Sequence, residues 1–360
     1  MYDKEKTSKL KASELKASEL KASELKASEL KASELKANDI DLYLSSTDQP
    51  YVKFEQCAPI TLGEEWSRGA FGSVHVVDTP TGKIAVKRVP ELLGHINREL
   101  DTCTRLASDN HPNIVQLLGF WTESITPDKR CLYLVMEFMP ETLGNVLERL
   151  SLNKMRMKQC RMNAMMGQLA SALDYLEQIK LMHRDLKPDN ILVNVDTNRV
   201  VLADFGSAKF IEEGQPNVTY VCTRFYRAPC LILGRDIYST SVDIWSFGCV
   251  LAEFAYGSPL FRGDTQIDVM ARIIKIRGMV TLDDIAHMPT YRPEIIEMDG
   301  IGLRCNVMPW SKVFTKRLED KRVNTSYGKD YEQILDDCLQ WNPLKRVSAY
   351  DLARNSAWFK

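Results

Sequence analysis

The sequence predicts an α+β fold of two lobes, a small β-rich lobe with one main helix followed by a larger, mainly helical lobe. The first observation is the alternation of apolar and polar residues over residues 57–139, interrupted by one helical pattern. The second is the change to helical patterns from residue 140 onward, including a methionine-rich apolar stretch at residues 158–179. The third is a polar loop between two short apolar runs at residues 181–193.

Length and composition allow this organisation and exclude several other classes. The chain has 360 residues, of which 44% are hydrophobic, enough to form the cores of two lobes. Its net charge of −1 gives no bulk attraction to nucleic acid or membrane, so neither is expected as a partner. Nine scattered cysteines without a C-x-x-C pair or a signal peptide predict reduced thiols and a cytoplasmic or nuclear location. No apolar run approaches the roughly 20 residues of a membrane span.

The N-terminal segment repeats KASEL five times over residues 11–35. Successive leucines of such a repeat step about 140° around a helix and form no apolar stripe. Residues 1–38 are therefore predicted to be a solvated helix or disordered, and residues 39–56 an extended lead-in. A coiled-coil or assembly protein built on this tail is an alternative that the five-residue period disfavours. The lobes then comprise residues 57–139 and 140–360.

The polar loop carries the pattern H-R-D-x-K-x-x-N, in which Asp, Lys and Asn each suit a role in phosphoryl transfer. Asp185 can accept the proton of an attacking hydroxyl, and Lys187 can steady the moving phosphoryl group. Asn190 offers a neutral oxygen to Mg²⁺. Asp204, in an Asp-Phe-Gly triplet behind an apolar strand, offers the charged oxygen that a hard cation prefers.

Three further residue groups suit the binding of a nucleotide. Gly69 and Gly72 lie in a glycine-containing loop whose backbone N–H groups can close over phosphates, although Ser67 replaces its first glycine. Lys87 ends the run IAVK and would hold the α and β phosphates. Glu99 lies in a helical pattern at residues 95–106 and can form the ion pair that fixes Lys87.

Taken together, these motifs resemble those of the eukaryotic protein kinases over residues 54–360. The resemblance implies the protein kinase fold, with ATP and Mg²⁺ as cofactors. It makes Met136 the gatekeeper beside the adenine and residues 137–139, including Glu137 and Met139, the hinge that hydrogen-bonds the base. The adenine walls implied are Val74, Ala85 and Leu192. The polar loop at residues 181–193 corresponds to the catalytic loop of kinases, and Asp243 is expected to hold its backbone.

Within the kinases, the chain most resembles the glycogen synthase kinase-3 family. The stretches that carry this likeness are DFGSAK at residues 204–209, PNVTYVCTRFYRAP at 216–229, PET at 140–142 and PWSKVF at 309–314. An apparent insertion at residues 281–325 also fits the branch of cyclin-dependent and MAP kinases. The resemblance implies Ser/Thr specificity, substrates already phosphorylated four residues after the target, and scaffold proteins that bind the larger lobe.

The same resemblance implies a pocket for that substrate phosphate. Arg98, Arg184 and Lys209 are expected to converge beside the activation segment, residues 206–229, where two guanidinium groups and an ammonium suit a phosphate dianion. Many relatives fill this pocket with their own phosphothreonine, but Val218 stands at that position here. Tyr220 is then the expected regulatory tyrosine, and its phosphate could pair with Arg224 or Arg227. Thr219 is an alternative, because its phosphate could enter the pocket in place of the substrate phosphate.

Two departures from the kinase pattern support a rival interpretation, a pseudokinase scaffold without phosphoryl transfer. They are Ser67 in the glycine-containing loop and Cys230, which stands where a glutamate is usual. Because that glutamate normally pairs with a buried arginine, Arg346 is expected to lack its acceptor. The residues that argue more strongly for an active enzyme are all present: Lys87, Glu99, Asp185, Asn190 and Asp204.

Overall fold

The computed structural model describes residues 59–69, 72–80, 82–92, 98–126, 129–155, 157–281, 283–284, 307–315 and 328–355. The KASEL tail, the lead-in at residues 39–56 and most of the insertion predicted at 281–325 lie outside these ranges. Apart from Leu92, every described residue belongs to one compact unit formed by Lys53–Glu91 and Asn97–Lys360.

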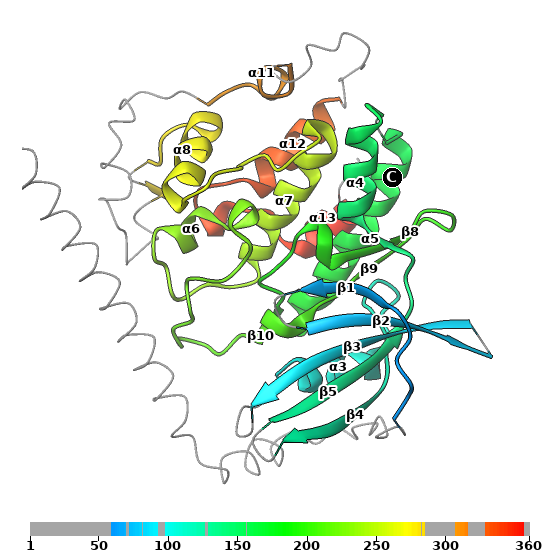
Figure 1. Ribbon diagram of the computed structural model, residues 1–360. Coiled ribbons are helices and arrows are strands. Elements are labelled where there is room, and N and C mark those ends of the chain that lie inside the picture. Colours follow the sequence, from blue (N-terminus) through cyan, green and yellow to red (C-terminus); the bar gives the residue numbers. More distant parts are fainter. Residues whose placement is uncertain are drawn as a thin grey trace, which may run out of the picture. The chain divides into compact units, whose positions relative to one another are not determined.

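A five-stranded sheet forms the first lobe, in the order β1-β2-β3-β5-β4 (Figure 1). Its strands are β1 (Glu65–Gly69), β2 (Gly72–Thr79), β3 (Gly82–Leu92), β4 (Leu117–Thr126) and β5 (Lys129–Glu137). Strand β5 is buried on both faces, because Leu132 and Leu134 join the main core while Cys131, Tyr133 and Val135 join a second apolar cluster. This double burial explains why β5 reads as an almost unbroken apolar run rather than an alternating one.

Helix α3 (Arg98–Asp109) carries Glu99 into this lobe. Its buried residues are spaced three and four apart, which places them on one face of the helix: Glu99, Thr102, Cys103, Leu106 and Ala107. The sequence pattern predicted a helix at residues 95–106, and the described helix begins and ends three residues later. Arg98, one residue before Glu99, is exposed at the start of the helix.

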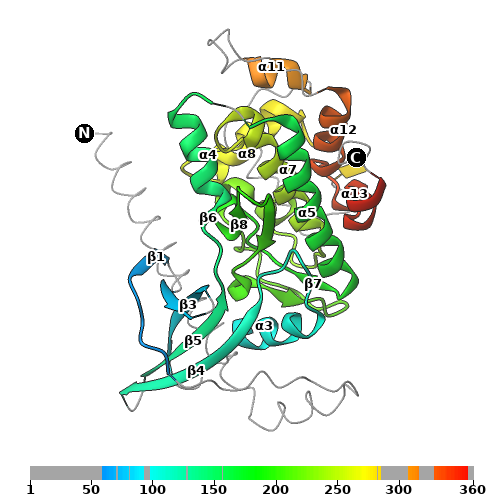
Figure 2. The ribbon, with the colours of Figure 1, turned by 90° about the vertical axis from the view of Figure 1, so that its right-hand side faces the viewer.

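Helices dominate the second lobe (Figure 2). They are α4 (Leu143–Leu152), α5 (Gln159–Gln178), α6 (Pro229–Ile232), α7 (Ser241–Tyr256), α8 (Gln266–Arg277), α11 (Trp310–Thr315), α12 (Lys329–Cys338) and α13 (Ala349–Asn355). The methionine-rich stretch forms α5 and buries Met162, Met165 and Met166. Among the described helices, none is long and apolar enough to cross a membrane.

Helix α7 is the central element of this lobe, since residues 242–255 are all buried. It approaches α12 closely at Gly248, where an added Cβ would lie 2.8 Å from the Cβ of Cys338. The helix ends at Gly257, whose φ of 74° provides the left-handed cap that glycine adopts without strain. A rigid, buried α7 gives the loops that pack against it a fixed support.

Short strands hold the polar loops. Strands β6 (Glu141–Thr142), β8 (Ile191–Asn194) and β9 (Arg199–Leu202) form one sheet, and β7 (Leu181–Met182) pairs with β10 (Lys209–Phe210). The loop with Asp185 therefore connects β7 to β8, and Asp204 is the second residue after β9. A sheet-rich lobe followed by a helical lobe confirms the predicted α+β fold.

The expectation that Arg346 lacks an acceptor is wrong. Its Nε donates to the carbonyl of Gln340 at 3.0 Å and its Nη1 to the carbonyl of Ser241 at 2.9 Å. The guanidinium also lies over the ring of Trp245, 5.3 Å from the centroid, and Nη2 is 3.7 Å from Sγ of Cys230. Backbone carbonyls take the place of the missing carboxylate, so the buried arginine remains hydrogen-bonded beside a cysteine.

Candidate active site

A cavity of about 520 Å³ lies between the sheet strands β1–β3, the segment after β5 and the loops that follow β7 and β9. All the residues predicted to bind the nucleotide line it: Gly69, Gly72, Val74, Ala85, Lys87, Glu137, Met139 and Leu192. Glu99, Lys187, Asn190 and Asp204 line the same cavity. The fold thus brings together residues that are separated by up to 135 positions in the sequence, from Gly69 to Asp204.

Strand register explains why the β2 and β3 residues face this cavity. Val74 lies opposite Lys87, and Val76 lies opposite Ala85. Since alternate residues of a strand point to the same face, these two cross-strand pairs present four side chains to one side of the sheet. Gly72 has a further reason to be glycine, because its φ is 151° and an added Cβ would lie 2.0 Å from the carbonyl oxygen of Arg88.

Lys87 joins two carboxylates within the cavity. Its Nζ lies 2.5 Å from Oε1 of Glu99 and 2.8 Å from Oδ1 of Asp204. Burial works against the charge on Lys87, but the fields of Glu99 and Asp204 outweigh it and raise the pKa of this ammonium. Burial also opposes the charge on Asp204, and Lys87 outweighs it, so that the pKa of this carboxyl is lowered. Burial raises the pKa of Glu99 despite the nearby ammonium.

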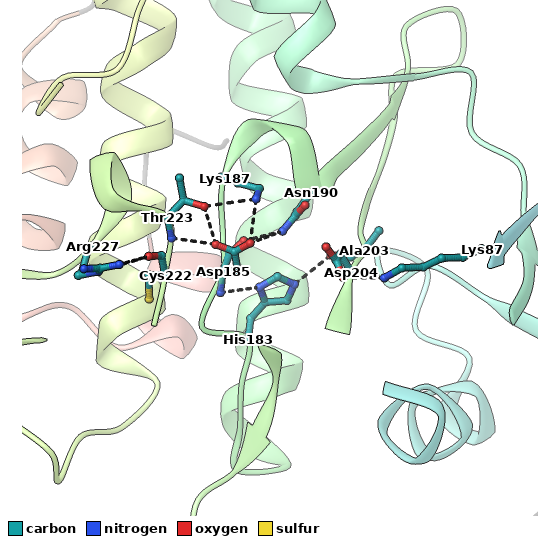
Figure 3. A network of polar contacts seen from close by, with 10 residues as sticks. All are labelled: Lys87, His183, Asp185, Lys187, Asn190, Ala203, Asp204, Cys222, Thr223 and Arg227. Atoms are coloured by element: carbon teal, nitrogen blue, oxygen red, sulfur yellow. Dashed lines mark hydrogen bonds and ion pairs between the residues drawn. The ribbon is translucent and has the colours of Figure 1, made fainter. Parts of the chain in front are cut away.

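Asp185 is held at both of its carboxylate oxygens, as Figure 3 shows. Oδ2 accepts from Nζ of Lys187 at 2.9 Å and from the amide of Asn190 at 3.1 Å. Oδ1 accepts from the backbone nitrogen of Thr223 at 2.9 Å and from its hydroxyl at 2.8 Å. The carboxylate is therefore fixed by the catalytic loop on one side and by the activation segment on the other.

Asn190 and Asp204 fit the requirements of a magnesium ion. The Asn190 amide nitrogen donates to the backbone carbonyl of Asp185 at 2.8 Å, which fixes the amide with its oxygen available as an acceptor. Oδ1 of Asp204 accepts a hydrogen bond from Nζ of Lys87 at 2.8 Å, and the carboxylate supplies the negatively charged oxygen ligand that a cation prefers. Among the described residues, no three His, Cys, Asp or Glu side chains gather as a metal site. Two protein oxygens suffice for Mg²⁺, because this ion usually keeps waters and substrate phosphates as its other ligands.

Buried polar groups hold the backbone of the catalytic loop in place. Asp243 of α7 accepts the backbone N–H groups of His183 and Arg184, both at 2.8 Å, as predicted for this residue. The His183 ring lies 3.0 Å from the carbonyl of Ala203 and packs edge-on against Phe205. Arg184 and Asp204 have positive φ values of 64°, a conformation that costs energy for such residues and is often found at functional sites.

Of the basic residues predicted to bind a substrate phosphate, Arg184 and Lys209 adjoin Ser207 in contact or in sequence, and Arg98 precedes Glu99. Nε of Arg184 donates to the carbonyl of Ser207 at 2.7 Å, and Lys209 begins β10 opposite Met182. Arg98 adjoins Glu99, whose Oε2 lies 3.4 Å from the position that a Cβ on Gly206 would occupy. The backbone of residue 218 is connected to the same region, since Arg184 contacts the hydroxyl of Tyr238, which donates to the Val218 carbonyl at 2.7 Å.

Tyr220 lies beside the two arginines predicted to receive its phosphate. Its side chain is exposed, and the guanidinium of Arg227 lies 4.3 Å from the centre of its ring. A hydrogen bond with Arg224, together with the charge of Arg227, lowers the pKa of the Tyr220 hydroxyl. Arg227 is itself anchored by the carbonyls of Val221 and Cys222, at 2.7 Å each.

Sequence reasoning missed three contributors to the site. Thr223 holds Asp185, and its only sequence signal is a position just before the segment RFYRAP at residues 224–229. Arg199 of β9 forms an ion pair with Glu137 and so ties the predicted hinge to the second lobe. Trp66 of β1 lines the cavity and meets Phe138; an aromatic residue directly before the glycine-containing loop was the available signal.

The comparison with known protein families gives one match. The family model described as a protein kinase domain matches residues 61–359, which is most of the chain. The match includes both lobes and every residue that lines the cavity.

Proposed function

The chain belongs to the protein kinase family, and on that premise we propose that it is an active Ser/Thr protein kinase that uses Mg·ATP. The observation that carries the proposal is the position of Lys87, which contacts Glu99 and Asp204 at once. Kinases need this ion pair and the metal-binding aspartate in place together for phosphoryl transfer. A pseudokinase would have no need to maintain such a costly buried arrangement.

Five polar residues in or beside the cavity have defined tasks in this mechanism. Lys87 binds the α and β phosphates, and Asn190 and Asp204 hold the metal ion. Mg²⁺, when bound, neutralises the charge that develops on the phosphates. The substrate hydroxyl attacks the γ phosphorus, its proton passes to the carboxylate of Asp185, and the bond to ADP breaks. Lys187, 2.9 Å from Asp185, stabilises the transferred phosphoryl group.

The preference for primed substrates is supported by three basic residues and one apolar residue. Arg184 is bonded to the Ser207 carbonyl and Lys209 begins the strand that pairs with β7, which supports the proposal that these residues and Arg98 offer charge-assisted hydrogen bonds to a phosphate. The side chain of Val218 is 66% exposed and cannot be phosphorylated. A phosphate of the substrate, four residues after the target, would take the place of an internal one. This preference, like the Ser/Thr specificity, follows the resemblance to glycogen synthase kinase-3.

Regulation by Tyr220 is the second part of the proposal. Its exposed hydroxyl is accessible to phosphorylation, and the charges of Arg224 and Arg227 favour a negative group there. Phosphorylation would tie the activation segment to Arg227, which already adjoins the Asp185 partner Thr223 through the Cys222 carbonyl.

The decisive experiment uses two peptides of identical sequence, one with a phosphoserine four residues after the target serine. With Mg·ATP, the chain should phosphorylate the primed peptide with a higher kcat/KM. Equal rates would reject priming but keep the kinase function. If the chain bound nucleotide but phosphorylated neither the two peptides nor any general protein substrate, it would be a pseudokinase instead.

A further inference from the structure

We propose that Trp66 and Phe138 form an aromatic clamp that closes the rim of the nucleotide cavity and slows nucleotide release. This inference rests on the proposed binding of Mg·ATP. The two rings lie with their centroids 5.8 Å apart and their planes at 84°, which is an edge-to-face contact. Both residues line the cavity, one from strand β1 and the other from the segment after β5.

The exposure of Trp66 is unusual within this chain. Its relative exposure is 54%, whereas the other described tryptophans, Trp121, Trp245, Trp310 and Trp341, are at most 6% exposed. A large apolar ring that lines a cavity and remains open to solvent has surface available for a flat ligand. A purine base in the cavity would cover part of this ring, which gives the exposed tryptophan a binding role.

The backbone of β1 is irregular at the residue that carries this ring. Glu65 pairs with His75 and Ser67 pairs with Val74, so Trp66 is the extra residue of a β-bulge. A bulge re-aims a side chain and increases the local twist of the strand. Every residue of β1 is exposed, so the bulge serves no core packing. Its consequence is the position of Trp66 at the rim of the cavity.

Phe138 is held from a second direction. The ammonium of Lys83 in β3 lies 6.0 Å from the centre of its ring, at the limit of a cation–π contact. The Phe138 ring therefore has contacts with both β1 and β3 of the sheet. Phe138 lies in the segment that is expected to hydrogen-bond the base. Its contact with Trp66 therefore connects strand β1 to this segment. If the rings form a clamp, they must separate before a bound nucleotide leaves through this rim.

The test measures the dissociation rate of Mg·ADP by stopped flow, with a fluorescent methylanthraniloyl derivative of ADP as the probe. The variants are Trp66→Leu, Phe138→Leu and the double variant, with Trp66→Phe as a conservative change. Tyr350→Leu is the matched control, since it removes an aromatic ring of similar exposure, 48%, on α13 outside the cavity. Each single leucine variant should release the probe about two- to tenfold faster, in line with the strength of an aromatic pair.

The double variant distinguishes a clamp from two independent contacts. If the rings act as a pair, the double variant should release the probe no more than about twofold faster than the faster single variant. The Trp66→Phe variant should stay closer to the parent than Trp66→Leu, and the control should match the parent. Unchanged rates in the leucine variants, or effects that multiply in the double variant, would overturn the clamp. Failure of the parent chain itself to bind Mg·ADP would overturn the proposed function and the clamp together.

Discussion

Thr223 donates two hydrogen bonds to the same oxygen of Asp185, one from its backbone nitrogen at 2.9 Å and one from its hydroxyl at 2.8 Å. The hydroxyl also lies 3.3 Å from Nζ of Lys187, which contacts the other oxygen of Asp185. The activation segment therefore takes part directly in orienting the proposed proton acceptor. Any displacement of this segment would release one side of the Asp185 carboxylate.

The first prediction concerns this hydroxyl. Thr223→Val keeps the shape and the backbone bond but removes the hydroxyl, and kcat should fall about tenfold, the scale of one hydrogen bond to a charged group. The KM for ATP should change little, because Thr223 lies outside the nucleotide cavity. Steady-state kinetics would measure both values. Thr223→Ser is the matched control and should keep most of the activity; a valine variant as active as the serine variant would disprove the orienting role.

The second prediction concerns the cysteine beside Arg346. Cys230 is fully buried, and Arg346 already donates to the carbonyls of Gln340 and Ser241. A glutamate would therefore add volume and a buried charge without rescuing an unpaired arginine, and overpacking costs about 1–3 kcal/mol. Cys230→Glu should lower the melting temperature measured by calorimetry. Cys230→Gln, of equal size and no charge, separates the two effects; a glutamate variant more stable than the parent would show that Arg346 still needs a carboxylate.

The sequence was sufficient to predict the two-lobed fold and the main polar residues of the cavity, because each of these depends on a local pattern, whereas the apolar walls of the cavity followed from the family resemblance. Glu99 could be paired with Lys87 because it lies on a helical pattern at a suitable distance from the IAVK strand, and the face of α3 carries it inward. The acceptors of Arg346 could not be predicted, since backbone carbonyls leave no trace in residue identity. The contact between Trp66 and Phe138 depends on a bulge in β1, which only the strand register reveals.

The third prediction tests the metal-binding role of Asp204. Asp204→Asn keeps the shape but removes the charged oxygen available to Mg²⁺, and kcat should fall ~10²-fold or more, as when a key charge-stabilising group is lost. The melting temperature should change little, because Glu99 continues to pair with Lys87. Peptide phosphorylation and thermal unfolding would measure the two effects. Asp196→Asn makes the same chemical change at an exposed turn and should be neutral; near-normal turnover of the Asp204 variant would reject the proposed mechanism.

The fourth prediction concerns Arg98 and the primed substrate. Arg98 is exposed at the start of α3, next to Glu99 but pointing away from the buried face, so its removal should leave the ion pair of Lys87 intact. Arg98→Ala removes one charged partner of the substrate phosphate, which is expected to cost roughly 1.5 to 3 kcal/mol, or about tenfold or more in kcat/KM. The loss should appear with the primed peptide and be much smaller with its unprimed twin.

Arg272→Ala provides the matched control for this experiment, because it removes an exposed arginine from α8, away from the phosphate region. It should leave the ratio of the two kcat/KM values unchanged. Equal losses on both peptides in the Arg98 variant would reject the phosphate pocket. Thr219→Ala tests the alternative that the basic residues bind a phosphate carried by the chain itself. If this variant lost activity on both peptides, that phosphate, rather than one on the substrate, would be the natural ligand of Arg98, Arg184 and Lys209.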